Sequence, residues 1–179
     1  MLHGPRLDLR ARKEEDVAVL HADLYDDVET RSRTDGSAWR PRPVASSPYN
    51  PVEPTEKVSD FTVVERATGE VVGATLLWWI DTHNRSAHIG VGLRPAWRGK
   101  GYGTEIVTIL CRYAFTVLGL HRLQIETLAD NDAMIATAKA AGFQLEGTTR
   151  QSSWVLGGFR DDVVFGLLAE DWIDPAAPR

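Results

Sequence analysis

Several residue types and patterns are scarce in this sequence, and each absence narrows the class of protein. Cys111 is the one cysteine, so no internal disulfide can form, and a reducing compartment is the simpler expectation. No apolar run approaches the roughly 18 residues of a membrane helix. The N-terminus also lacks the basic and apolar regions of an export signal. We therefore expect a cytoplasmic protein without a membrane partner.

Patterns that would indicate nucleic-acid or metal binding are also missing. The 25 acidic residues outnumber the 20 lysines and arginines, which gives a net charge of −5 and argues against a nucleic-acid partner. The same balance mildly favours a cationic substrate. The sequence shows no metal-ligand spacing, internal repeat or nucleophilic triad, so we expect no metal. With 43% hydrophobic and 25% charged residues, residues 1–179 are expected to form one soluble domain.

The most informative stretch is a glycine-rich loop, R-G-K-G-Y-G-T, over residues 98–104. Its three alternate glycines can take positive φ values and let N–H groups converge. The helix expected to follow offers unpaired donors and a partial positive charge, to which Arg98 and Lys100 add full charges. Such a loop can hold a pyrophosphate, although a turn that only links a strand to a helix is the alternative. The spacing fits neither the Rossmann fingerprint nor the P-loop.

A strand and a helix are predicted to open the chain. Leu7 and Leu9 alternate with charged residues, and residues 14–24 place their apolar side chains on one helical face. Three β-rich segments follow, at Phe61–Glu65, Val71–Ile80 and Ala87–Leu93. A hairpin turn at Thr68-Gly69 joins the first two, which predicts an antiparallel meander.

A proline-rich segment over residues 36–59 separates these two parts. Five prolines forbid regular pairing there: Pro41, Pro43, Pro48, Pro51 and Pro54. A loop of this length is usually functional or mobile, and an ordered but inert excursion is the alternative. Trp39 and Tyr49 could bind a ligand or could pin the loop to the body of the protein.

The second half of the chain predicts a crossover between parallel strands. After the glycine loop an apolar stripe recurs at helical spacing: Ile106, Val107, Leu110, Tyr113, Ala114 and Val117. Gly119 is well placed to end this helix, and Arg122–Leu128 alternates as a strand. The strands at 87–93 and 122–128 should therefore pair in parallel, with the glycine loop at the carboxyl end of the first.

The loop resembles the acyl-CoA loop of the GCN5-related N-acetyltransferases, the GNAT superfamily. Its signature, R/Q-x-x-G-x-G/A, maps onto Arg98, Gly101 and Gly103. The resemblance implies an α+β fold in three layers. Its central sheet is mixed and mostly antiparallel, contains a splayed parallel pair, and is flanked by helices.

A second series of residues narrows the resemblance. It reads N-(x)10-G-F-(x)2-E-G-(x)2-R from Asn131 to Arg150, and continues with Gly158, Asp161 and the E-D-W at 170–172. This series resembles the RimJ/RimL branch, which acetylates protein N-terminal amines. Together with the loop, the resemblance covers about residues 60 to 172.

The resemblance implies acetyl-CoA as the acyl donor and assigns residues to bind it. In the GNAT fold the strand at 87–93 splays and pairs with the pantetheine arm, so main-chain groups of Val91 and Leu93 would meet the ligand. Lys139 could contact the outer phosphates or could simply be solvated. The implied binding residues are Val91, Gly92, Leu93, Arg98, Gly99, Lys100, Gly101, Tyr102, Gly103, Thr104, Asn131 and Lys139.

The general acid of the family is absent. Many GNAT enzymes place a tyrosine seven positions after the asparagine, where this chain has Ala138. The serine that RimL-type relatives use three positions after the asparagine is Met134 here. Three side chains could substitute, as could bound water: Ser152, Ser153 and Tyr102.

His88 and Asn131 are the catalytic candidates. The mechanism implied by the resemblance is direct attack of a bound amine on the acetyl thioester, through a tetrahedral intermediate and without an acyl-enzyme. His88 titrates near neutrality and could accept the proton of the amine, directly or through water, although it could equally be structural. Glu126 competes for this role if it faces the cleft, but its alternation with Ile125 points it elsewhere. Asn131 would orient the pantetheine or a water, and could also simply cap a helix.

Three functions are compatible with the sequence. The first is acetylation of a protein or peptide N-terminal amine. The second is acetylation of a small cationic amine or antibiotic, and the third is a weakly catalytic acyl-CoA-binding module. A homodimer is possible.

Overall fold

The computed structural model describes residues 1–53 and 55–175. Pro54, the last of the five prolines named above, lies outside these residues. The helices are α1 (Glu14–His21), α2 (Val28–Thr34), α3 (Tyr102–Arg112) and α4 (Asp132–Ala140). The strands are β1 (Leu2–His3), β2 (Leu7–Arg10), β3 (Ser59–Glu65), β4 (Val71–Asp81), β5 (Ser86–Leu93), β6 (Arg122–Leu128), β7 (Gln144–Val155) and β8 (Gly158–Leu168).

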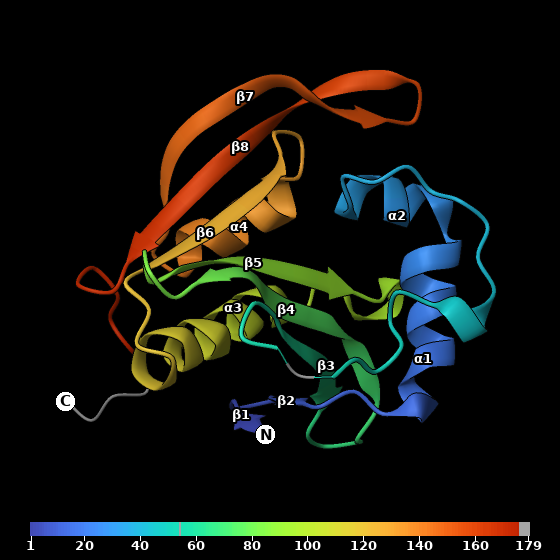
Figure 1. Ribbon diagram of the computed structural model, residues 1–179, viewed down its shortest axis with the longest axis horizontal. Helices are drawn as coiled ribbons and strands as arrows, with labels where there is room; N and C mark the ends of the chain where they lie inside the picture. The colour runs from blue at the N-terminus through green and yellow to red at the C-terminus, as the bar shows by residue number, and fades with distance from the viewer. Residues whose placement is uncertain (54, 176–179) are drawn as a thin grey trace.

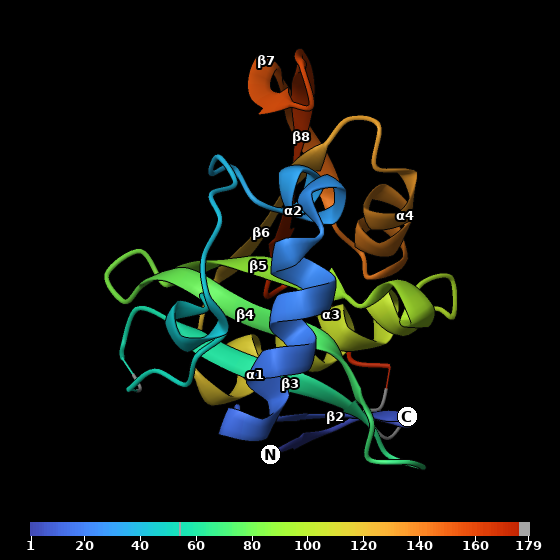
Figure 2. The same ribbon diagram turned by 90° about the vertical axis from the view of Figure 1, so that its right-hand side faces the viewer.

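The strands form one mixed sheet of eight, in the order β1-β2-β3-β4-β5-β6-β8-β7. Among the strands of residues 1–53 and 55–175, only β5 and β6 pair in parallel, and all other neighbours are antiparallel. Helices lie on both sides of this sheet, and α1 crosses the face of β3 and β4 (Figure 2). The α+β architecture in three layers is therefore confirmed, as are the antiparallel meander and the parallel crossover.

Two apolar clusters hold the layers together. The larger one joins α3 to the sheet and includes Leu9, Ile89, Ile106, Leu110 and Ile125. The smaller one lies under α1 and contains Leu20, Leu24 and Ala74. Each face of the sheet is thus covered by a helix that contributes its apolar stripe.

The end of the central helix differs from the sequence-based expectation. Val117 was expected in the buried stripe, yet 67% of its surface is exposed. The last turn, Tyr113–Val117, is a π-helix in which the N–H of Leu118 bonds the carbonyl of Tyr113. This wider turn rotates the following side chains out of the 3.6-residue stripe. The helix then ends at Gly119 with a φ of 64°, as expected.

The proline-rich segment is pinned to α1 and the turn after it. The Tyr25 hydroxyl donates to the carbonyl of Arg40 at 2.8 Å, and the Trp39 indole donates to the carbonyl of Tyr25 at 2.9 Å. His21 contacts Ser47 Oγ at 2.9 Å. Within the described part of the segment, regular structure is limited to a short 3₁₀ turn, Val44–Ser46, an isolated bridge between Thr55 and Val58, and the start of β3 at Ser59. Trp39 therefore pins the loop, which is one of the two roles expected from the sequence.

Two further features emerge from the arrangement of the elements. The β7–β8 hairpin extends away from the body (Figure 1) and exposes Trp154, Leu156 and Phe159. The expected homodimer stays a prediction. Among the described residues, no helix is long and apolar enough to cross a membrane.

Leu110 and Val117, both on the central helix, give a matched test of how this helix packs. Leu110→Ala empties a fully buried site and is expected to lower the free energy of unfolding by about 2–5 kcal/mol in urea titrations. Val117→Ala, at an exposed site, is expected to change it by no more than about 0.5 kcal/mol. Equal losses in the two variants would contradict the register of the helix described here.

Candidate active site

The parallel pair β5–β6 opens into a cavity. The two strands pair at three positions, Ser86 with Arg122, Ala87 with Leu123 and His88 with Gln124, and then diverge. A cavity of about 780 Å³ fills the gap. It is lined by the end of β5, the glycine loop, and parts of α2, α3 and α4. The splayed pair predicted from the sequence is thus present.

The main chain of β5 faces this cavity at alternate residues. The N–H of Arg94 bonds the carbonyl of Val72 on β4, and Leu93 stands opposite Gly73. Because antiparallel pairing alternates along a strand, the N–H and C=O of Val91 point away from β4, as do those of Leu93. They point toward the edge of β5 that faced β6 before the two strands diverged. These groups are placed to bond an extended ligand as a neighbouring strand would.

The glycine loop turns its donors toward the same cavity. Gly99 and Gly101 both have a φ of 74°, which a residue with a Cβ adopts only with strain. Gly101 is the N-cap of α3 and offers no side chain to the first N–H groups of the helix. Those donors and the helix dipole therefore remain available for an anion.

Arg6 holds the carbonyl side of the loop. Its guanidinium donates to the carbonyls of Lys100 at 3.1 Å and Gly101 at 3.4 Å, and to the carboxylate of Glu105 at 2.9 Å. Glu105 in turn accepts the N–H of Arg6 at 2.7 Å and that of Leu7 at 2.9 Å. With its carbonyls engaged on this side, the loop presents its N–H groups on the other. Sequence reasoning missed Arg6, because nothing local marks a partner 94 residues away.

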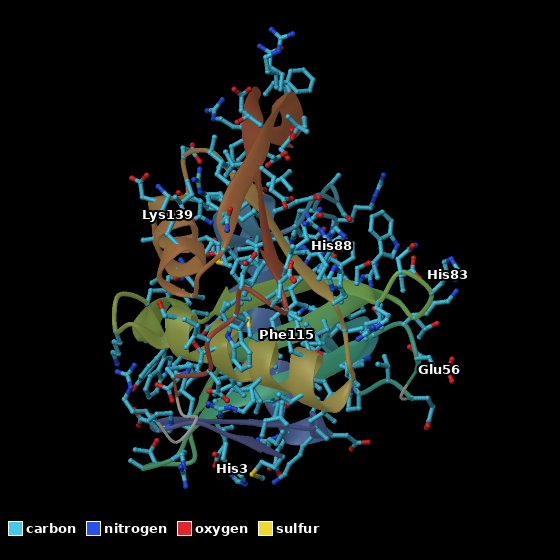
Figure 3. All side chains as sticks on the ribbon, turned by 90° about the vertical axis from the view of Figure 1, so that its left-hand side faces the viewer. His3, Glu56, His83, His88, Phe115 and Lys139 are labelled. Carbon is cyan, nitrogen blue, oxygen red and sulfur yellow. The ribbon has the colours of Figure 1, made fainter. Side chains whose placement is uncertain are left out.

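Most of the expected acetyl-CoA-binding residues line the cavity, and three do not. Those that line it are Val91, Leu93, Arg98, Gly99, Gly101, Tyr102, Gly103, Thr104 and Asn131. Gly92 lines a second cavity instead. The ammonium of Lys100 lies 4.2 Å from the centroid of the Trp97 ring, and Lys139 is exposed on α4 (Figure 3). The binding roles of all these residues stay predictions.

Asn131 caps α4, which is one of the two roles expected of it. Its Oδ1 accepts the N–H of Met134 at 3.3 Å, and its Nδ2 donates to Thr127 at 2.9 Å. Arg98 likewise has local partners, the carbonyl of Leu93 at 3.1 Å and the hydroxyl of Thr30 at 3.1 Å. Both side chains are therefore positioned by the fold at the cavity wall.

The side chains considered as substitute acids are directed elsewhere. The Tyr102 hydroxyl donates to Glu65 at 2.6 Å, and this bond raises the pKa of Tyr102. Ser152 and Ser153 both donate to Asp162 at 2.6 Å. None of these three hydroxyls is free to face the cavity, which favours water as the proton donor.

His88 lies on β5 before the strands diverge and lines neither cavity. Its ring contacts Trp78 and Trp79 at centroid distances of 4.8 and 5.4 Å. The buried Nδ1 has no hydrogen-bond partner among the described residues. Burial lowers the pKa of His88, while the carboxylate of Glu126 opposes that shift and Arg122 adds to it. Its role as a base stays a prediction, and Glu126 lines neither cavity either.

The second cavity, of about 340 Å³, lies on the α1 side of the sheet. Its floor includes Ala74, Leu76 and Gly90, and its roof includes Tyr49 from the proline-rich segment. Val91 and Thr34 line both cavities. Sequence patterns did not predict this cavity, apart from the suggestion that Tyr49 could bind a ligand, because its walls come from segments far apart in the chain.

A splayed parallel pair with a glycine loop at the N-terminus of the following helix is the arrangement expected of an acyl-CoA-dependent transferase. Residues 6–144 match the model of the acetyltransferase (GNAT) domain, so the chain belongs to the GNAT family. It is an N-acetyltransferase that uses acetyl-CoA.

Individual relatives agree with this family. The chain is 30% identical over 176 residues to the uncharacterized N-acetyltransferase p20 of Bacillus licheniformis. The aligned region covers 96% of this chain and 97% of p20. The chain is 34% identical over 104 residues to the putative ribosomal N-acetyltransferase YdaF of Bacillus subtilis, over 58% of this chain and 57% of YdaF. Spermidine N-acetyltransferase from Vibrio cholerae, solved with CoA and spermine, has the same fold. The TM-score is 0.78 at 20% identity, over 94% of this chain and 98% of that one.

Gly101 provides a direct test of the loop. Gly101→Asp is expected to abolish acetyl-CoA binding in calorimetry, because a Cβ strains the left-handed backbone and a carboxylate repels the pyrophosphate. Gly119→Asp is the control, since Gly119 also has a positive φ but does not line the cavity. Unchanged affinity in Gly101→Asp would refute the assignment of the loop.

His88 can be tested by two measurements, the dependence of Tm on pH and the pH-rate profile. Its lowered pKa means that the unfolded chain binds the proton more readily, so stability is expected to fall as the pH drops through and below about 6.5. His88→Asn should reduce this fall in Tm. If His88 is also the base, the substitution should move the pH-rate profile of acetyl transfer, and an unaltered profile would remove it from that role.

Proposed function

We propose that this enzyme acetylates the α-amine of a protein or peptide N-terminus, as the RimJ/RimL branch does. The observation that carries the proposal is that two cavities meet at β5, where Val91 lines both. Acetyl-CoA would occupy the larger one and the acceptor the smaller one. The acyl group and the amine would then meet at Val91, in the geometry that direct transfer requires.

The chain contributes binding, orientation and polarisation. The N–H groups at the start of α3 would hold the pyrophosphate. The main-chain groups of Val91 and Leu93 would fix the pantetheine arm and polarise the carbonyl of the thioester. Acetyl-CoA supplies the activated acetyl group, and its thiol is a tolerable leaving group near neutrality because a thiol titrates near pH 8.5.

An N-terminal acceptor suits a site with no dedicated base at its centre. An α-amine with a pKa of about 7.8 is partly neutral at pH 7, whereas a lysine amine with a pKa of about 10.4 is not. The titratable side chains of the smaller cavity are Arg12, Arg31, Asp35, Tyr49 and Asp60. A histidine is not among them, so an acceptor that is already partly neutral asks least of this protein.

Acetylation of a small cationic amine is the second candidate. Structures with the same fold include spermidine N-acetyltransferases, one of them solved with spermine. The net charge of −5 also favours a cation. Two arginines in the smaller cavity weigh against a polycation.

A thiol-release assay with acetyl-CoA tests these alternatives. We expect turnover with short peptides that have a free N-terminus, and loss of that turnover when the same peptides are N-terminally blocked. Release only with polyamines or antibiotics would transfer the proposal to the second candidate. If none of the amines causes thiol release, the weakly catalytic acyl-CoA-binding module would be the remaining interpretation.

A further inference from the structure

The smaller cavity carries a balanced set of charges. Two arginines and two aspartates line it, Arg12 with Asp60 and Arg31 with Asp35. The remaining lining is mostly apolar or glycine, which keeps these charges in a partly dehydrated environment where they act strongly on a ligand.

The Arg12–Asp60 pair is built into the sheet. Arg12 Nη2 lies 2.6 Å from Asp60 Oδ1 and also donates to the carbonyl of Phe61 at 3.2 Å. The Arg12 side chain is only 4% exposed. These bonds and a longer one from Nε to Thr62 leave Nη1 without a partner among the described residues. Its donors remain for a ligand oxygen.

Asp60 lies two strands away from β5, on the same face of the sheet as Gly90. Asp60 stands opposite Leu76 on β4, and Leu76 stands opposite Gly90 on β5, the residue before Val91. Directly paired residues share a face of the sheet, so the Asp60 carboxylate lies on the cavity side. Burial raises its pKa, against the opposing effect of Arg12.

The second pair faces the first from α2 and its end. Arg31 Nη2 lies 2.7 Å from Asp35 Oδ2. Tyr49 lies between the two pairs. Arg12 is 5.4 Å from the centroid of its ring. Burial raises the pKa of Tyr49, against the opposing charges of Arg31 and Arg12. A ligand in this cavity therefore meets alternating charges of both signs.

We propose that this cavity selects acceptors in which a carbonyl or carboxylate oxygen lies next to the amine, and disfavours polyamines. This inference rests on the proposed function. The ammonium or amine would lie against Asp60, and the neighbouring oxygen would accept from Arg12 or Arg31, whose forked donors match such oxygens. A polyamine would satisfy the aspartates but would place its other charges against the arginines, which is selection by repulsion.

Two sources share this chemistry, a peptide N-terminus and a free amino acid. The assay therefore uses four acceptors: an alanine-initiated tetrapeptide, alanine, isopropylamine and spermidine. Isopropylamine is alanine with a methyl group in place of the carboxylate. Rates are expressed as kcat/KM for the neutral form of each amine. We expect the tetrapeptide, alanine or both to exceed isopropylamine and spermidine by about tenfold or more.

Two variants should shift this preference in opposite ways. Arg31→Gln is expected to lower kcat/KM for the preferred carbonyl acceptor by about tenfold and to raise it for spermidine. Asp60→Asn is expected to lower the value for spermidine more than for the carbonyl acceptor, because spermidine has only the aspartates to bind. A folding defect would lower kcat/KM for both acceptors by the same factor. Arg40→Gln is the control for the same chemical change, since Arg40 lies in the proline-rich segment outside both cavity linings.

Three outcomes would overturn the inference. A wild-type preference for spermidine or isopropylamine would remove the role of the neighbouring oxygen, while leaving the enzyme an acetyltransferase. Equal losses for both acceptors in Arg31→Gln and Asp60→Asn would show that the charges do not select. Thiol release with none of the acceptors would instead overturn the proposed function, and this inference with it.

Discussion

The early end of hydrogen bonding between β5 and β6 is the constraint on which the rest of the site depends. Pairing stops after His88, although β5 continues to Leu93 and β6 to Leu128. The main-chain groups of the last β5 residues are therefore left facing a cavity, which is costly unless water or a ligand bonds them. Because Val91 of β5 lines both cavities, this one strand would position both substrates of the proposed reaction.

The glycine loop and α3 complete the larger cavity through contacts far apart in sequence. The loop needs positive φ values at Gly99 and Gly101, and its carbonyls are held by Arg6. Gly103 has a different function, since a Cβ there would lie 3.0 Å from Thr137 Oγ1 on α4. The glycines thus serve two needs, backbone conformation in the loop and close approach between α3 and α4.

Sequence patterns predicted most of the central fold because they are local. Alternation and helical spacing located β2 to β6, α1 and α3, and the crossover rule predicted the parallel pair. The glycine spacing located the loop. Helix α2 and the β7–β8 hairpin were missed. Strand β7 is largely exposed, so its residues carry little apolar alternation. The second half of β8 is buried and does alternate, with Val163, Phe165 and Leu167 in the core.

The part of the site that could not be predicted is made by non-local contacts. Arg6, Arg12 and Asp60 are ordinary surface-type residues in the sequence, and only the packing of distant strands brings them to the two cavities. The contacts expected of Lys139 and Lys100 with the ligand stay predictions. Their charge and proximity to the motif suggested ligand contact, but both side chains are exposed and lie outside the lining of the larger cavity.

The contact between Arg6 and Glu105 also has a consequence for biosynthesis. Residues 99 positions apart must meet before the glycine loop acquires its rigid shape. During translation the loop and α3 emerge long after β2, so the N-terminal strand must stay available until they arrive. The affinity predicted for the nucleotide portion of the cosubstrate should therefore arise late in folding, because it depends on the closed chain and not on the motif alone.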